Sequence, residues 1–174
     1  LNIPEAGNGT PNILSECRVE LEWILKMQRE DGAVYHKATT AQHAPFVMPE
    51  DDTAQMYVLP VSSSATADLA AVCALASGFY REYDADFAER LRSAAVKSAE
   101  WMEANPDFIA FRQPEGCNTG WYGEMDDMTN RFWAWAELYA LTGERKYHER
   151  MKAVLEEPYP PAVWEQNPFW KKYM

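Results

Sequence analysis

Cysteine is scarce in this chain, and its odd count argues against a disulfide framework. Three cysteines occur among 174 residues, and none has a histidine at a spacing typical of a thiolate nucleophile or a zinc knuckle. Cys17 and Cys73 fall on apolar helix faces, so we expect both to be small core residues. Cys117 lies in an aromatic loop and is expected to be the most accessible of the three.

Positive charge and long hydrophobic runs are also lacking. Sixteen basic side chains stand against 27 acidic ones, which gives a formal net charge of -11. Nucleic acid and anionic membrane surfaces attract cationic faces, so both are poor partners. The longest apolar run, residues 69–76, is far shorter than the ~20 residues of a membrane span. The negative charge does not argue against neutral ligands. Seven tryptophans and nine tyrosines provide aromatic rings on which sugars could stack.

Regular strand alternation is absent too, and apolar residues recur at intervals of three and four. The sequence therefore predicts an all-α chain with no sheet beyond a short ribbon in the loops. The helices with the most apolar faces, 65–83 and 129–141, should be the most buried. Expected helices cover residues 11–28, 65–83, 84–105, 129–141 and 145–155.

Capping residues mark several of these boundaries. Thr10 is expected to cap the first helix, with Pro11 at its first position. Residues 62–64, three serines in succession, should cap the second helix, and Asp84 begins the third. Asn105 precedes a proline and should end the third helix.

The stretch between the first two helices shows no period. Residues 33–61 hold three prolines, two histidines and the acidic run 50–52. A structureless loop of this length inside a compact domain is often functional. The acidic run itself is interpreted as a solvated loop edge.

Two segments about 60 residues apart resemble one another. Residues 79–91 and 138–151 each read as the end of a buried helix, a tight polar turn and an aromatic anchor that opens an amphipathic helix. This pattern predicts a repeated helical hairpin. Solenoid repeats are usually ~34–47 residues, so the longer period favours a ring of inner and outer helices with long loops.

Four stretches of the chain carry a recognisable pattern: residues 1–28, 31–37, 62–72 and 131–139. In this order they resemble the central part of glycoside hydrolase family 9 catalytic domains. The resemblance is clearest over residues 1–155, within a partial domain taken as 1–174. It implies an incomplete (α/α)6 toroid from a secreted or periplasmic enzyme that cleaves β-1,4-glucans such as cellulose with inversion.

Both catalytic roles of that family are expected to be missing from the chain. The family activates its water with an aspartate of an Asp-Ala-Gly-Asp motif, which does not occur here. Its general acid is a glutamate beyond the region that matches Met174. Inverting hydrolases need carboxyl groups roughly 6.5–9.5 Å apart across the scissile bond, and the adjacent pairs 51–52 and 126–127 cannot straddle a bond in this way. We therefore expect an inactive segment that needs the remainder of the catalytic domain or self-association to cover its open helix faces.

Three residues match positions that the family uses in its glucan cleft. The resemblance implies that His36 bonds a sugar hydroxyl and that the rings of Trp121 and Tyr122 stack on the glucan. The alternatives are a loop histidine bonded to backbone and aromatic rings packed on the barrel. Trp133 and Trp135 lie two apart on a helix, and core packing is favoured for both.

The acidic pair Asp126 and Asp127 suggests calcium, since hard cations prefer clustered carboxylates and carbonyls. Family members bind calcium here through an acidic pair just before the Arg-aromatic-Trp run, where this chain has Thr129 and Asn130. The alternative is that the aspartates only favour the start of a helix. No cofactor is expected to be required, and calcium is a candidate ligand.

Two other functions stay open. A helical carbohydrate-binding or assembly module would keep the aromatic cleft without the chemistry. Another toroidal sugar enzyme, such as an epimerase or an unsaturated-glucuronyl hydrolase, is disfavoured by the long loop 33–61 and by the Ser-Ser-Ser-Ala-Thr-Ala-Asp run.

Overall fold

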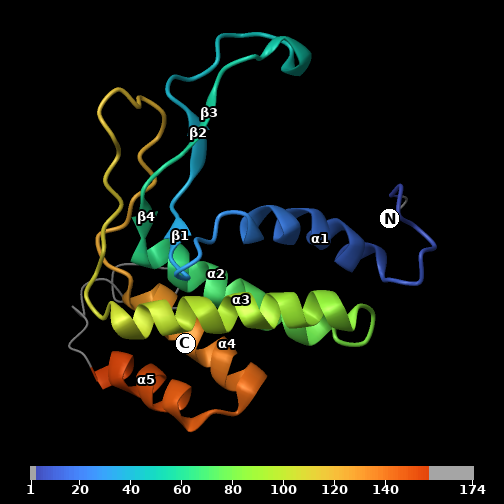
Figure 1. Cartoon of the computed structure of the whole chain (residues 1–174), viewed down its shortest axis with the longest axis vertical. Helices are drawn as coiled ribbons and strands as arrows, with labels where there is room; N and C mark the ends of the chain where they lie inside the picture. The colour runs from blue at the N-terminus through green and yellow to red at the C-terminus, as the bar shows by residue number, and fades with distance from the viewer. Residues whose placement is uncertain (1–2, 157–174) are drawn as a thin grey trace, which may run out of the picture.

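The computed structural model describes residues 3–156 of the chain. Within this range five α-helices alternate with long loops, and two antiparallel ribbons of two strands each follow the first helix (Figure 1). This confirms the predicted helices and the limit of short ribbons in the loops. The helices are α1 (Asn12–Leu25), α2 (Ser63–Tyr80), α3 (Ala85–Ala104), α4 (Met128–Thr142) and α5 (Arg145–Glu156).

The ribbons connect α1 to α2 and lie where no strand period was visible. β1 pairs with β4 next to the helices, and β2 pairs with β3 further out, with Thr39 opposite Tyr57. A short 3-10 helix, η1 (Pro49–Asp51), lies between β2 and β3. The strands are β1 (Val34–Tyr35), β2 (Ala38–Thr40), β3 (Met56–Val58) and β4 (Val61–Ser62).

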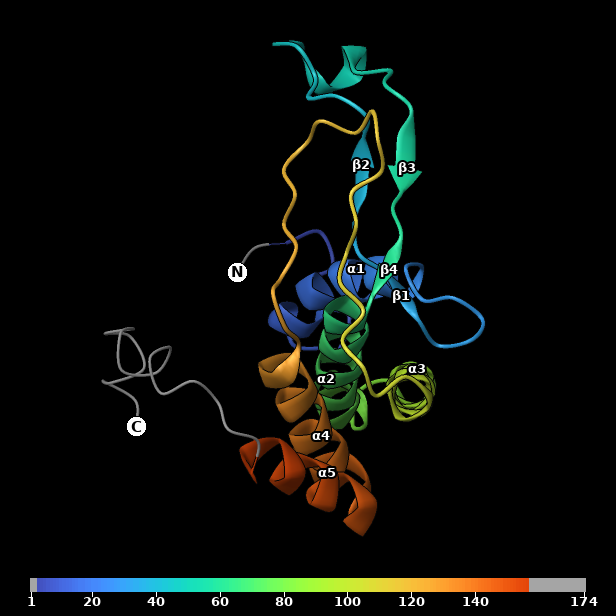
Figure 2. The same cartoon turned by 90° about the vertical axis from the view of Figure 1, so that its left-hand side faces the viewer.

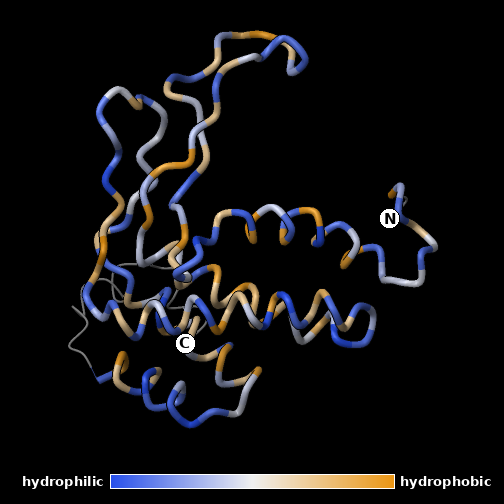
Figure 3. Tube along the Cα trace, in the orientation of Figure 1, coloured by the Kyte–Doolittle hydropathy of each residue, from blue (hydrophilic) through white to orange (hydrophobic). Residues whose placement is uncertain are grey.

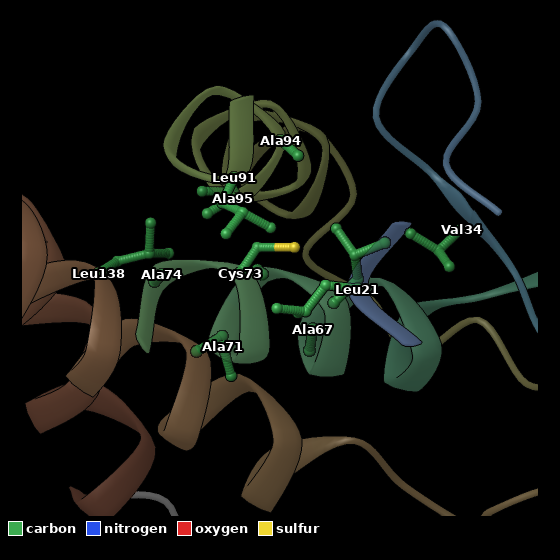
Figure 4. Close-up of a cluster of buried hydrophobic side chains, with 14 of the residues drawn as sticks. Leu21, Val34, Ala67, Ala71, Cys73, Ala74, Leu91, Ala94, Ala95 and Leu138 are labelled. Atoms are coloured by element: carbon green, nitrogen blue, oxygen red, sulfur yellow. The ribbon is translucent and has the colours of Figure 1, made fainter. Parts of the chain in front are cut away.

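Helix α2 is the centre of the packing. It contacts α1, α3 and α4, and α5 packs on α4 (Figure 2). Alanine and other small residues line its buried faces, so neighbouring helices approach closely on several sides. Figure 4 shows Ala67, Ala71, Cys73 and Ala74 of α2 beneath Leu91 and other side chains of the core. The predicted burial of this helix and of Cys73 is confirmed.

The predicted repeat is present as two helical hairpins. In α2–α3 the ring of Phe87 packs edge-on against Tyr80, with centroids 4.8 Å apart. In α4–α5 the ring of Tyr147 stacks on Trp135 at 5.9 Å. Both anchors are almost fully buried. The aromatic residue that opens each second helix therefore fixes it onto the helix before it.

Helix ends agree with the sequence where a side chain caps the backbone. Ser62 Oγ accepts from Ala65 N at 3.1 Å, and Asp84 Oδ1 accepts from Phe87 N at 2.9 Å. The predicted cap at Thr10 is wrong by one position: Pro11 is the N-cap, without a side-chain hydrogen bond.

Helix α1 is only partly buried. Only Ser15 and Leu21 are buried along its length, and Cys17 is exposed. The predicted core position of Cys17 is therefore wrong, because α1 rests on α2 along a narrow stripe. Cys117 is half-buried, so Cys17 is the more accessible thiol. No helix in the range 3–156 has the length and apolar character to cross a bilayer.

The β2–β3 ribbon forms an arm that projects from the helices, and the loop between α3 and α4 runs beside it (Figures 1 and 2). Figure 3 shows hydrophobic residues at the far end of the arm. Phe46 and Met48 there are exposed, as are Met56 and Tyr57 of β3. Glu50 and Asp51 are also exposed, which confirms the interpretation of the acidic run as a solvated edge.

Candidate functional site

The three candidate binding residues meet at the base of the arm. His36 lies between β1 and β2, and its backbone N–H donates to the Pro60 carbonyl at 3.1 Å. Trp121 and Tyr122 belong to the α3–α4 loop, far away in sequence. The His36 ring reaches that loop directly, since Nε2 lies 3.0 Å from the Tyr122 carbonyl oxygen. The fold thus brings together the two segments that carry the predicted residues.

Both ring nitrogens of His36 have partners in the protein. A carbonyl oxygen only accepts, so Nε2 carries the proton that is donated to Tyr122. Nδ1 then accepts from the Ser62 hydroxyl at 2.8 Å. The ring face stacks on Phe111, with centroids 4.1 Å apart and planes 8° from parallel. A sugar hydroxyl that bonds this ring must therefore replace one of these partners.

Burial governs the charge of His36. It lowers the pKa of the imidazole below its ordinary value, against the raising effects of the Tyr122 carbonyl and the Glu124 carboxylate. The neutral ring is therefore favoured, consistent with a proton on Nε2 alone. In this state His36 serves as a donor to the aromatic loop.

Trp121 and Tyr122 lie between two glycines in an irregular stretch of the α3–α4 loop (residues 120–123, here named the aromatic turn), and both side chains are exposed. Tyr122 has φ of 53°, which places its backbone in the left-handed region. A Cβ added at Gly120 would lie 2.5 Å from the Tyr122 ring, and one at Gly123 would lie 2.3 Å from the Trp121 ring. The Tyr122 ring thus lies over Gly120 and the Trp121 ring over Gly123. A side chain at either glycine would displace the ring that covers it.

Lys37 was not singled out by the sequence, yet it is central to this turn. Its ammonium donates to Gln113 Oε1 at 2.9 Å, to Thr119 Oγ1 at 3.2 Å and to the Gly120 carbonyl. It also lies 5.4 Å from the centroid of the Tyr122 ring. Only the neighbouring histidine carried a recognisable role, so no local signal marked the lysine.

Asp68 of α2 is a second residue that sequence reasoning missed. It lines a pocket of about 200 Å³ together with His36, Trp23 and Tyr35. Burial raises the pKa of the Asp68 carboxyl, against the lowering effect of the hydrogen bond from Asn130, whose Nδ2 lies 2.9 Å from Oδ1. Its place in the Thr-Ala-Asp part of the 62–72 stretch was the available signal.

The acidic pair before α4 is committed to structural bonds. Asp127 Oδ2 accepts from Arg131 Nε at 2.7 Å inside the protein. Asp126 Oδ1 accepts from Met128 N at 3.1 Å, as expected of an acid at a helix start. Residues 3–156 contain no group of three or more acidic, histidine or cysteine side chains arranged to hold a metal. Since Asp127 is already paired with Arg131, the bonds shown here are those of an acid at a helix start and of an ion pair. Calcium binding by the pair stays a prediction, and no step of the chemistry is assigned to calcium.

The two tryptophans of α4 have different surroundings. Trp135 is buried, which confirms its predicted core position. Trp133 is 38% exposed and its Nε1 donates to Glu137 at 3.1 Å, so core packing is wrong for it. Residues two apart on a helix point to different sides, and only one of these sides faces the core.

Known proteins resemble this chain in sequence. The sequence model of glycosyl hydrolase family 9 matches residues 2–174. A cellodextrinase of Butyrivibrio fibrisolvens is 49% identical over 150 residues, which cover 84% of this chain and 27% of the relative.

Solved structures extend the similarity to the fold. A metagenome-derived family 9 endoglucanase matches with a TM-score of 0.85 and 37% identity, over 94% of this chain and 30% of that one. AaCel9A in complex with cellobiose-like isofagomine matches with a TM-score of 0.81 and 33% identity, over 86% of this chain and 29% of that one. The chain thus spans under a third of the length of these proteins.

Proposed function

Because the chain belongs to glycosyl hydrolase family 9, we propose that it forms part of the glucan-binding cleft of an enzyme that hydrolyses β-1,4-glucans with inversion. The family match over residues 2–174 confirms the resemblance seen in the sequence. The structural matches confirm the fold class, helical hairpins of an (α/α)6 toroid. A cellodextrinase and an endoglucanase among the relatives support a cellulose-type substrate.

The observation that carries the proposal is the exposure of two aromatic side chains on a fixed turn. Trp121 and Tyr122 are 47% and 76% exposed, although burial of such large apolar rings would be favourable. Aromatic faces stack on the apolar faces of pyranose rings, and nearby polar groups accept bonds from hydroxyls. Glu124 is exposed beside the turn and supplies such an acceptor.

Binding and orientation are the contributions that we assign to this chain. Inversion requires one carboxylate to activate water and one carboxylic acid to protonate the leaving oxygen. The chain contains no Asp-Ala-Gly-Asp sequence, and Asp127 is already bonded to Arg131. We assign both catalytic carboxyl groups to parts of the catalytic domain outside this chain. The remainder of the domain is then the partner of this chain.

A non-catalytic carbohydrate-binding or assembly module is the second candidate, and the missing aspartate motif favours it. Both candidates predict glucan binding by the aromatic turn. They differ when the chain is combined with the remaining parts of a family 9 catalytic domain. Release of reducing sugar from soluble cellulose by the combination supports the enzyme, whereas binding without release supports the module.

The binding proposal is tested by titrating cellotetraose into the chain in a calorimeter. Trp121→Ala should weaken binding by roughly three- to tenfold, because one stacking ring is lost. Trp133→Ala is the matched control, since this tryptophan is similarly exposed but lies on α4 away from the turn. Equal affinity of the wild type and Trp121→Ala would refute the role of the turn.

A further inference from the structure

We propose that Lys37 is the positioning residue of the aromatic turn and holds Trp121 and Tyr122 in the conformation that presents their rings to a glucan. This inference rests on the proposed glucan binding. It starts from the turn itself: Tyr122 has φ of 53°, a conformation that L-residues avoid. Such a backbone persists only where surrounding contacts fix it.

The contacts that fix the turn come from two consecutive residues. Lys37 Nζ donates to the carbonyl of Gly120, and His36 Nε2 donates to the carbonyl of Tyr122. Trp121 lies between these two carbonyls in the chain. His36 and Lys37 therefore fix the backbone on both sides of Trp121. Because both acceptors are backbone carbonyls, neither bond depends on the side chain at position 120 or 122.

Lys37 makes more than one hydrogen bond to the α3–α4 loop. An ammonium has three donors, and Gln113, Thr119 and Gly120 provide three oxygens for them. All three acceptors are neutral and belong to the α3–α4 loop. Lys37 forms no ion pair within residues 3–156, so its charge is directed at this loop and not at a carboxylate.

The cation also contacts two aromatic rings. Its nitrogen lies 5.4 Å from the centroid of Tyr122 and 5.6 Å from that of Phe111. Phe111 in turn stacks on His36. A cation within about 6 Å of a ring face is attracted to it, so the charge of Lys37 orients the exposed Tyr122 ring as well as the backbone beneath it.

The acceptors of Lys37 are braced by further bonds. Gln113 Nε2 donates to the carbonyls of Cys117 and Thr119, both at 2.8 Å. Thr39 of β2 donates to Thr119 Oγ1 at 3.1 Å. Hydrogen bonds thus hold residues 113–119 together and attach them to β2. Lys37 connects this bonded segment to the aromatic turn.

The test compares Lys37→Met with Lys37→Arg and the control Lys26→Met, which changes an exposed lysine of the α1 end. Lys37→Met removes every donor and the charge but keeps an unbranched side chain. We expect it to weaken cellotetraose binding by about tenfold, the equivalent of one charge-assisted hydrogen bond. Lys37→Arg keeps the cation and should recover part of this loss, although its planar fork does not match three converging oxygens.

A double-mutant cycle separates positioning from direct sugar contact. If Lys37 acts through the turn, Lys37→Met has no further effect on binding once Trp121 and Tyr122 are both alanine. A full tenfold loss in that background would overturn the proposal, because Lys37 would then bind the sugar itself.

A readout without glucan distinguishes this proposal from the proposed function. The indole N–H resonance of Trp121, assigned from its loss in Trp121→Ala, should move in Lys37→Met and stay in Lys26→Met. An unchanged Trp121 resonance in folded Lys37→Met would refute the positioning role. If Lys37→Met does not fold, the same comparison is made with Lys37→Arg, where an unmoved resonance and unchanged affinity overturn the proposal. A wild type that binds no glucan, with the resonance moved as expected, refutes the proposed function alone.

Discussion

Replacing Arg131 with methionine removes the cation that joins the end of α3 to the start of α4. Its Nε donates to Asp127 Oδ2 at 2.7 Å, and the two side chains are only 10% and 7% exposed. Nη2 donates to the carbonyls of Asn105 and Asp107 at 2.9 and 3.3 Å. The substitution leaves Asp127 charged and buried, and these carbonyls lose their donor.

The cost follows from this burial. Removing one partner of a buried ion pair typically destabilises a protein by about 3–5 kcal/mol, out of a total stability of roughly 5–15 kcal/mol. Urea unfolding of Arg131→Met, followed by the helical circular dichroism signal, should therefore show a much lower midpoint with an unchanged slope.

The matched control is Arg145→Met, which breaks another pair at the same spacing of four residues. Arg145 Nε lies 3.3 Å from Glu149 Oε1, but the arginine side chain is 89% exposed. Surface pairs contribute little, so the midpoint should hardly move. A loss below about 1 kcal/mol in Arg131→Met, or equal losses in both variants, would show that the Arg131 contacts do not stabilise the α3–α4 junction.

Three further results are expected. Gly32→Ala should lower stability by about 2 kcal/mol or more in thermal unfolding, because φ is 95° and the new Cβ would lie 2.3 Å from a backbone oxygen of α3. Stability should fall between neutral pH and about pH 5 partly through His36, because burial lowers its folded-state pKa; the unfolded chain then takes up the proton first. A thiol reagent should label Cys17 in the native chain but not buried Cys73, whose pKa burial raises to about 12.

Each of these has its own control. Gly78→Ala, in the last turn of α2 with open space at its Cβ, should be neutral or stabilising by about 0.5–1 kcal/mol; equal losses at Gly78 and Gly32 would contradict the steric argument. His36→Gln should flatten the pH profile of unfolding, and parallel profiles would exclude His36 as the titrating group. Labelling of Cys73 as fast as Cys17 would contradict the packing around α2.

Much of the helical frame could be predicted because its determinants are local. Ser62 and Asp84 cap helices through hydrogen bonds to residues three positions on. Phe87 and Tyr147 open the second helix of each hairpin in equivalent sequence contexts, so the repeat was visible before the packing was known. Such contacts join residues that are close in sequence, so the sequence alone indicates both partners.

Contacts between distant segments could not be predicted in the same way. The bond from His36 to Tyr122 spans 86 positions, and that from Lys37 to Gly120 spans 83. Neither residue has a local pattern that names its partner. The resemblance to the family placed the two segments in one cleft, but it did not indicate that both nitrogens of His36 bond the protein.

Burial of individual helix residues was predictable only where a helix is enclosed. Cys73 lies on α2, which packs on several sides, and its core position is confirmed. Cys17 and Trp133 lie on helices with a face that no described element covers, and both were wrongly expected in the core. An apolar pattern shows which face is available for packing, not whether a neighbour reaches it.

The most direct test of the account is the response of the tryptophan indole N–H resonances to cellotetraose. The account predicts that Trp121 shifts on titration, that buried Trp135 stays in place, and that no reducing sugar is released during the experiment. Shifts at Trp135 with none at Trp121 would contradict the placement of the glucan on the aromatic turn. Release of glucose or cellobiose by this chain would contradict the assignment of both catalytic carboxyl groups to other parts of the domain.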